Sequence, residues 1–211
     1  MRRGIEVMRK LIMILVLGCL IGLTACAAQP NPTKPLEEFM YAFQNGASAS
    51  DDLTNYFSEE GKFALKLDAF DAGSDNEELV KTMDMVIRDI DYEIIETKIE
   101  KDTAIVTMKI TSHDIAGAYR AWIDGIVTRA MEWMNSGKTQ EELLAAELEL
   151  LNEAFLSTTK SKIDTVDVSM VLVDKEWQIT DSEENLPFID VLTGGFLSMV
   201  EDFEDPIPEI E

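Results

Sequence analysis

The sequence predicts an α+β domain in which two β-hairpins build one antiparallel sheet that packs against helices. Three observations support this fold class. Apolar residues recur every three or four positions between residues 36 and 90, two separate segments alternate apolar and polar residues, and a long helical pattern lies between those segments. We therefore expect residues 36–200 to form a single domain, with a long helical hairpin inserted between the two β-hairpins.

Helices are expected first along the folded part of the chain. The leading helix runs from Pro35 and ends near Gly46, a suitable C-cap. A second, short helix is expected to begin at Ser50 or Asp51, and a third spans residues 76–89. The side chains expected to face the core are Leu36, Phe39, Met40, Phe43, Leu53, Tyr56, Phe57, Leu79, Met83, Val86, Ile87 and Ile90.

Two β-hairpins are expected from segments that alternate with a period of two. The first pairs residues 92–100 with 103–112, and the second pairs residues 165–173 with 176–180. Each pair is joined by a two-residue turn, which in the second hairpin is Asp174-Lys175. The side chains expected on the buried face are Ala104, Val106, Met108, Ile110, Val166, Val168, Met170 and Leu172.

The segment between the hairpins predicts two antiparallel helices. Asp114 is placed to cap the first helix, which ends near Gly137. Thr139 and Glu142 have the spacing of a capping box that opens a second helix running to about Leu156. The apolar stripes are Ile115, Tyr119, Trp122, Ile126, Ala130 and Trp133 on the first helix, and Leu144, Leu148, Leu151 and Phe155 on the second.

The last part of the chain predicts a helix over residues 188–200 that is interrupted at Gly194 and Gly195. Residues 201–211 are rich in acids and contain two prolines. We expect them to form an acidic tail without a packed structure.

The first 25 residues have the features of a signal peptide. Arg2, Arg3, Arg9 and Lys10 form a basic region, and the uncharged stretch 11–23 follows it. A helix needs about 20 apolar residues to span a bilayer, so this stretch is too short for a membrane span. Translation would start at Met1 or at Met8, and the pattern does not decide between them.

The sequence Leu23-Thr24-Ala25-Cys26 resembles the lipobox of bacterial lipoproteins. The resemblance implies cleavage before Cys26, attachment of diacylglycerol to its thiol, and a mature chain held on the outer face of the cell membrane. Residues 26–35 would then be the lipidated cysteine and a proline-rich tether. An ordinary secretory signal and a retained membrane anchor are the alternatives.

Composition excludes several classes of function. The whole chain has 18 basic and 41 acidic residues, and cleavage before Cys26 would leave a mature chain with a net charge of −26. Such a protein does not suit nucleic acid, because binding a polyphosphate needs basic residues. One histidine and two cysteines exclude zinc fingers and multi-histidine metal centres, and we expect no cofactor.

The order of elements also carries a family resemblance. The lipobox at residues 23–26, the strand-to-helix junction at 110–115 and the hairpin at 171–180 resemble Gram-positive bacterial lipoproteins that have a nuclear-transport-factor-2-like (cystatin-like) domain of unknown function. The resemblance implies a curved sheet that wraps around helices as a cone with an interior pocket. It implies no catalytic residues.

His113 and Asp114 are one candidate for chemistry, because a histidine beside a carboxylate can act as a general base. Asp114 also suits a helix cap, and adjacent side chains seldom point together. Two other patterns have a functional and a structural interpretation. The acidic loop 68–78 would bind a cation or would be a solvated loop. Tyr119, Trp122 and Trp133 would form a ligand platform or part of the core.

The function that these features favour is an extracytoplasmic, lipid-anchored module that binds a small ligand or another envelope protein and is not an enzyme. The lipid on Cys26 would attach it to the membrane, and its ligand-binding residues are unknown. The alternatives are a cone-fold enzyme that transfers protons with a buried carboxylate or His113, and a structural or chaperone-like envelope protein.

Overall fold

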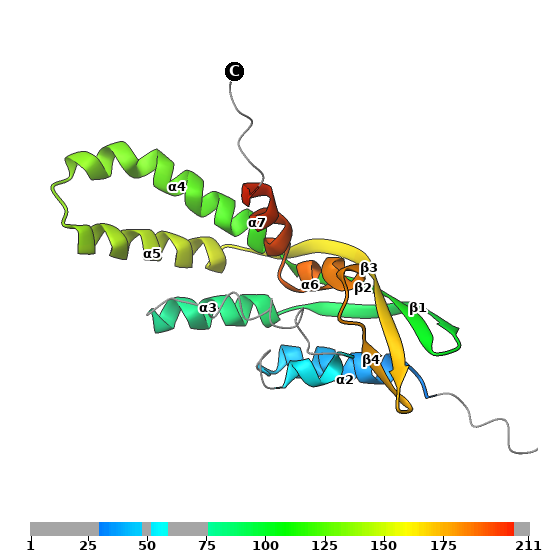
Figure 1. The fold of residues 1–211 in the computed structure, drawn as a ribbon. Coiled ribbons are helices and arrows are strands. Elements are labelled where there is room, and N and C mark those ends of the chain that lie inside the picture. The colour runs from blue at the N-terminus through cyan, green and yellow to red at the C-terminus, as the bar shows by residue number, and fades with distance from the viewer. Residues whose placement is uncertain (1–29, 48–51, 59–75, 205–211) are drawn as a thin grey trace, which may run out of the picture. The chain divides into compact units, whose positions relative to one another are not determined.

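The computed structural model describes residues 30–47, 52–58 and 76–204 (Figure 1). The signal peptide, Cys26, most of the acidic loop 68–78 and residues 205–211 lie outside the described residues. The chain divides into two compact units, residues 1–31 and 32–211, and all elements below belong to the second unit.

Three helical elements precede the sheet. They are α2 (Thr33–Gln44), the 3₁₀ helix η1 (Leu53–Tyr56) and α3 (Glu77–Arg88). The first and third agree with the prediction. The expected second short helix is present as a 3₁₀ helix that begins at Leu53, later than the expected Ser50 or Asp51, and Leu53 and Phe57 are buried. The buried residues of α2 are Leu36, Phe39, Met40 and Phe43, as predicted.

The sheet has four antiparallel strands in the order β1-β2-β3-β4. These are β1 (Asp91–Glu100), β2 (Thr103–His113), β3 (Lys160–Val173) and β4 (Glu176–Ile179). Both predicted β-hairpins are confirmed. The second one turns at Asp174-Lys175, where both residues have positive φ, as a tight two-residue hairpin turn requires.

The helical hairpin connects β2 to β3, which are neighbours in the sheet (Figure 1). It consists of α4 (Ile115–Asn135) and α5 (Gln140–Leu156). Both predicted caps are present. The Asp114 carboxylate accepts a hydrogen bond from the Gly117 amide, and both hydrogen bonds of the capping box form at Thr139.

One face of the sheet carries the core and is called the inner face. Helices α2 and α6 (Leu186–Leu192) cover it. Phe39 of α2 and Phe188 of α6 have ring centroids 5.7 Å apart, and neither side chain is exposed. Apolar side chains thus fill the space between this face and the helices, where the resemblance implied a pocket. The inner face consists of Ala104, Val106, Met108, Ile110, Val166, Val168 and Met170.

Helix α7 (Phe196–Glu204) follows α6 after the predicted break and extends beyond the predicted end of the helix at residue 200. Gly194 and Gly195 both have positive φ. A Cβ atom on Gly194 would overlap the backbone oxygen of His113 and the side chain of Ile115. The two glycines are therefore needed for the chain to pass close to the junction of β2 and α4.

Two predicted details are wrong. Strand β3 begins at Lys160 and not at residue 165, because its first residues pair with the end of β2 although they lack the apolar alternation of a half-buried strand. Leu144 was expected to face inward but is 55% exposed. Leu143 is half-buried in its place, although Leu144 has the helical spacing of the stripe.

A buried asparagine that the sequence patterns did not single out ties the second hairpin to the helices. Asn185 ends the 3₁₀ helix η3 (Glu183–Asn185) and is fully buried. Its Oδ1 accepts a hydrogen bond from the Ser169 amide at 2.8 Å. Its Nδ2 donates to the carbonyl oxygens of Ser169 and Thr180 at 3.0 and 2.8 Å, and Thr180 Oγ1 lies 2.9 Å away.

Replacing Asn185 with Ala should therefore lower the free energy of unfolding by about 2–4 kcal/mol, because the buried amide of Ser169 and carbonyl of Thr180 lose this partner. Urea denaturation followed by tryptophan fluorescence measures the change. Asn135→Ala is the matched control, since Asn135 makes one exposed hydrogen bond to Met131 and should cost about 0.5 kcal/mol or less. Equal losses in the two variants would contradict this role of Asn185.

Candidate functional site

The inner face becomes polar at one end of β3. Lys162 and Asp164 lie on the same side of the strand as Val166, because side chains alternate along a strand. Lys162 pairs with Ser112 of β2, and Asp164 pairs with Ile110. All three polar side chains are buried or half-buried. The helices that cover the apolar part of the inner face leave a groove over this polar end.

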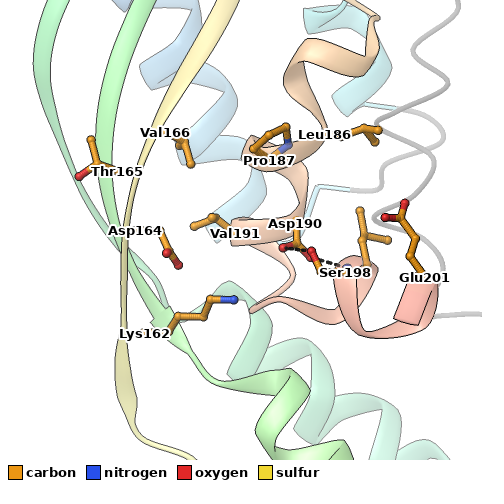
Figure 2. Close-up of a pocket in the computed structure, with 11 residues that line it drawn as sticks. Lys162, Asp164, Thr165, Val166, Leu186, Pro187, Asp190, Val191, Ser198 and Glu201 are labelled. Carbon is orange, nitrogen blue, oxygen red and sulfur yellow. Dashed lines mark hydrogen bonds between the residues drawn. The ribbon is translucent and has the colours of Figure 1, made fainter. Parts of the chain in front are cut away.

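The groove consists of two adjoining hollows of about 370 and 410 Å³. Lys162, Asp190 and Ser198 line both hollows, so they form the middle of the groove. Figure 2 shows the first hollow between β3 on one side and α6 and α7 on the other. Its other lining residues are Asp164, Thr165, Val166, Leu186, Pro187, Val191, Leu197 and Glu201, and those of the second are Asp114, Ala116, Arg120, Ser161 and Gly195.

Two polar atoms at this end of the inner face lack a partner. Ser112 Oγ and Asp164 Oδ2 are buried and have no hydrogen bond within the part of the chain that the structure describes. A buried polar group without a partner usually costs about 1–3 kcal/mol. Such atoms are therefore rare. Asp164 lines the first hollow, so its unpartnered oxygen indicates a place where a ligand or water would supply the missing bond.

The other groups of the groove are held by local bonds. Asp190 Oδ1 accepts a hydrogen bond from the Ser198 amide at 2.9 Å, and Oδ2 accepts one from Ser198 Oγ at 2.8 Å (Figure 2). Asp190 thus fastens the first turn of α7 to α6. A Cβ atom on Gly195 would overlap Lys162 Nζ, so the glycine provides the space in which the ammonium group lies.

The predicted pair of His113 and Asp114 is not formed, because the Asp114 side chain caps α4. His113 instead contacts residues from two other elements. Its Nε2 lies 2.9 Å from Asp89 Oδ2, just after α3, and its Nδ1 lies 2.9 Å from Thr158 Oγ1, just after α5. Lys160 Nζ completes the cluster at 2.6 Å from Asp89 Oδ1 and 3.1 Å from Asp91 Oδ2.

The bonds around His113 indicate a structural role. Thr158 Oγ1 donates its proton to the carbonyl of Phe155, so it accepts a hydrogen bond from His113 Nδ1. Both ring nitrogens thus contact oxygen atoms of other residues. The His113 side chain is 13% exposed and is not among the described residues that line the groove. Its contacts join three chain segments and leave no free nitrogen for a substrate.

The charges of this cluster alter two pKa values. Hydrogen bonds from Lys160, and next from His113, hold the pKa of Asp89 below its ordinary value. The hydrogen bond to Asp89 raises the pKa of Lys160. Asp89 therefore stays negatively charged and Lys160 positively charged over the pH range in which most proteins are stable.

The aromatic stripe of α4 belongs mainly to the packing. The Tyr119 ring lies 5.4 Å from Phe155 of α5 and 5.0 Å from Phe196 of α7. Burial raises the pKa of the Tyr119 hydroxyl. Trp122 Nε1 donates to the Glu147 carbonyl of α5 at 3.1 Å, and Trp133 is half-buried nearer the end of the hairpin. The structural interpretation of this stripe is supported for Tyr119 and Trp122.

The acidic loop and the lipobox stay predictions. Residues 68–75 and Cys26 lie outside the described residues, and only Asn76, Glu77 and Glu78 of the loop are seen, as the cap and first turn of α3. Within the described ranges, no three His, Cys, Asp or Glu side chains are grouped to hold a metal ion. None of the helices described here is both long and apolar enough to cross a bilayer.

The residues of the groove were not predicted from the sequence. Lys162 and Asp164 lie on the part of β3 before residue 165, where polar residues hide the strand pattern. The sequence did carry one sign that the strand begins earlier. Ile163 and Thr165 are two residues apart and lie on the face opposite to Lys162, Asp164 and Val166, as the alternation of a strand requires. The approach of α6 and α7 is a tertiary feature that no local pattern indicates.

Comparison with known proteins gives one structural likeness. No protein-family model matches the sequence, and no curated protein matches it. A crystal structure from Bacillus subtilis, described as a "putative lipoprotein (ycdA)", is similar with a TM-score of 0.49 and 18% identity. The likeness covers 77% of this chain and 56% of the Bacillus chain.

The cluster around Asp89 predicts a stability that depends on pH. Because the pKa of Asp89 is lowered, its stabilising contribution is present above the ordinary carboxyl pKa of about 4 and is lost as the pH falls through the lower, folded-state pKa. Asp89→Asn should lower the melting temperature by about 1–3 °C at pH 7, a small effect since the side chain is half exposed. The difference from wild type should shrink between pH 5 and pH 3.

Thermal unfolding of the two proteins across this pH range measures the effect. Asp91→Asn is the control, because Asp91 contacts Lys160 but not His113 and is more exposed, so its loss should be smaller. A difference between wild type and Asp89→Asn that stays constant down to pH 3 would contradict the assignment.

Proposed function

We propose that this chain is a lipid-anchored extracytoplasmic protein whose α+β domain binds a small ligand in the groove between β3, α6 and α7. The anchoring rests on the signal pattern of residues 1–25 and on Cys26 in the lipobox. A domain fixed by a short tether stays near the membrane, where a binding module would meet envelope molecules.

One observation carries the binding role more than any other. Asp164 has a buried carboxylate oxygen without a partner, and it lines a hollow of about 370 Å³ that also has an apolar wall. Pockets of about 300–1,000 Å³ with a mostly apolar lining and a few polar groups are typical of small-molecule sites. The remaining inner face is filled, so the groove is the favoured place for a ligand.

The alternative functions have weaker support. A proton-transferring enzyme would use His113 or a buried carboxylate, but both nitrogens of His113 are engaged, which leaves Asp164 as the candidate. A chaperone-like role would use Val127, Met131 and Met134, which are exposed at helical spacing on α4. Binding that depends on the groove distinguishes our proposal from the chaperone-like role, and turnover of a bound compound would favour the enzyme.

The anchor is tested with Cys26→Ala. Because the proposed membrane attachment is a lipid on this thiol, the variant should move from the membrane fraction to the soluble or secreted fraction, and mass spectrometry should find no acylated N-terminus. Cys19→Ala is the matched control, since Cys19 would leave with the signal peptide, and this variant should stay with the membrane. Retention of Cys26→Ala in the membrane would show that the protein is not anchored as a lipoprotein.

The groove is tested by filling it. The full-length protein in mild detergent is screened against a library of small envelope metabolites by thermal unfolding. A ligand at one hundred times its Kd stabilises the folded state by about 2.7 kcal/mol, a shift of a few degrees at this size. Leu197→Trp should abolish the shift, because Leu197 lines the first hollow and a larger ring would occupy it.

The control for this screen is Met134→Trp on the exposed end of α4, which should keep the full shift. A shift that survives Leu197→Trp but is lost in Met134→Trp would move the binding site to the helical hairpin. No shift from any compound would argue against a small-ligand function.

A further inference from the structure

The groove has an unequal distribution of charge between its two hollows. In the second hollow, the acids are already engaged: Asp114 accepts a hydrogen bond from Gly117, and Asp190 accepts two from Ser198. The cations are not engaged. Lys162 and Arg120 have no salt bridge within 4 Å in the described part of the chain. This hollow therefore offers two free positive groups to an anion.

The first hollow offers the opposite charge. Asp164 lines it with a carboxylate that has one buried oxygen without a donor, and Glu201 lies exposed at its rim. Val191 of α6 and Leu197 of α7 provide part of the apolar lining of the same hollow, and Figure 2 shows Val191 on the side of α6 that faces β3. A ligand group with N–H donors and positive charge would complete the bonds of Asp164.

Lys162 and Asp164 lie close together along β3, which favours a short ligand. Lys162 and Asp164 are two residues apart on one strand, so their Cα atoms are about 7 Å apart. Two residues of extended peptide span about the same length. Lys162 Nζ lies in the space beside Gly195, and both residues line the second hollow.

We propose that the groove binds a dipeptide with free termini. Its carboxylate would lie against Lys162 and Arg120, its ammonium group against Asp164, and an apolar side chain against Val191 and Leu197. The inference rests on the proposed ligand-binding function and adds the class of ligand. A simple anion such as phosphate fits less well, because it would meet the negative charge of Asp164 and Glu201, and a simple cation would meet Lys162.

The test uses four probes that differ only at their ends: leucyl-leucine, its N-acetyl derivative, its C-terminal amide and the doubly blocked compound. Their affinities for the full-length protein in mild detergent are measured by isothermal titration calorimetry. The zwitterion should bind about tenfold or more tightly than either singly blocked compound, because each blocked end removes one charge-assisted contact. Free leucine, which is shorter, should also bind more weakly, and inorganic phosphate more weakly still.

Two variants assign each end to its residue. In Lys162→Met, leucyl-leucine and its amide should bind with the same affinity, because the carboxylate has lost its main partner. In Asp164→Asn, leucyl-leucine and its N-acetyl derivative should differ by much less than in wild type. Both variants should melt close to the wild-type temperature, since neither side chain makes an ion pair within the described residues. The comparison of the four probes on wild type needs no variant.

The possible results separate the two levels of the proposal. Equal binding of all four probes, phosphate that binds as tightly as leucyl-leucine, or binding unchanged by both variants would overturn the dipeptide assignment. If no probe binds but a library compound gives a shift that Leu197→Trp abolishes, the dipeptide inference fails and the binding function stands. If neither the probes nor the library bind, both fail.

Discussion

The inner face of β2 and β3 has to be removed from water, and the rest of the structure depends on how this is done. Val106, Met108 and Val168 on this face are fully buried. Strands of the same sheet lie beside these side chains and cannot cover them. Helices from both ends of the folded chain cover them instead. Phe39 near the start and Phe188 near the end meet over the same face, with centroids 5.7 Å apart. Burial of this kind is the main stabilising contribution in a domain without a described disulfide.

The groove follows from the same constraint. Helix α6 covers the apolar part of β3, and the chain then turns at Gly194 and Gly195 into α7. The polar beginning of β3 stays open toward α6 and α7 across the groove. Lys162 and Asp164 therefore lie at a place where the sheet is paired but incompletely covered. The His113 cluster lies at the same end of β2, where Asp89 and Lys160 fasten α3 and β3 together. The cluster stabilises the fold at this end of the sheet, and the groove contains the polar groups that are available to a ligand.

Most of the fold could be predicted because its elements obey local rules. The helix at 76–89, the caps at Asp114 and Thr139 and both hairpin turns depend on residues close together in the sequence. The site could not be predicted in the same way. Its residues come from β3, α4, α6 and α7, and the strand that carries Lys162 and Asp164 has no apolar alternation there. Asn185 was missed for a similar reason, since its partners lie on two strands.

The central claim is that the polar end of the inner face, and no other part of the domain, receives the ligand. Methyl NMR of protein labelled at valine and leucine, titrated with leucyl-leucine, tests this most directly. We predict shifts for Val166, Val191 and Leu197, which line the groove, and no shifts for Val106 and Val168 in the filled core. Shifts confined to the exposed end of α4, or saturable binding with none of the groove methyls affected, would contradict the account.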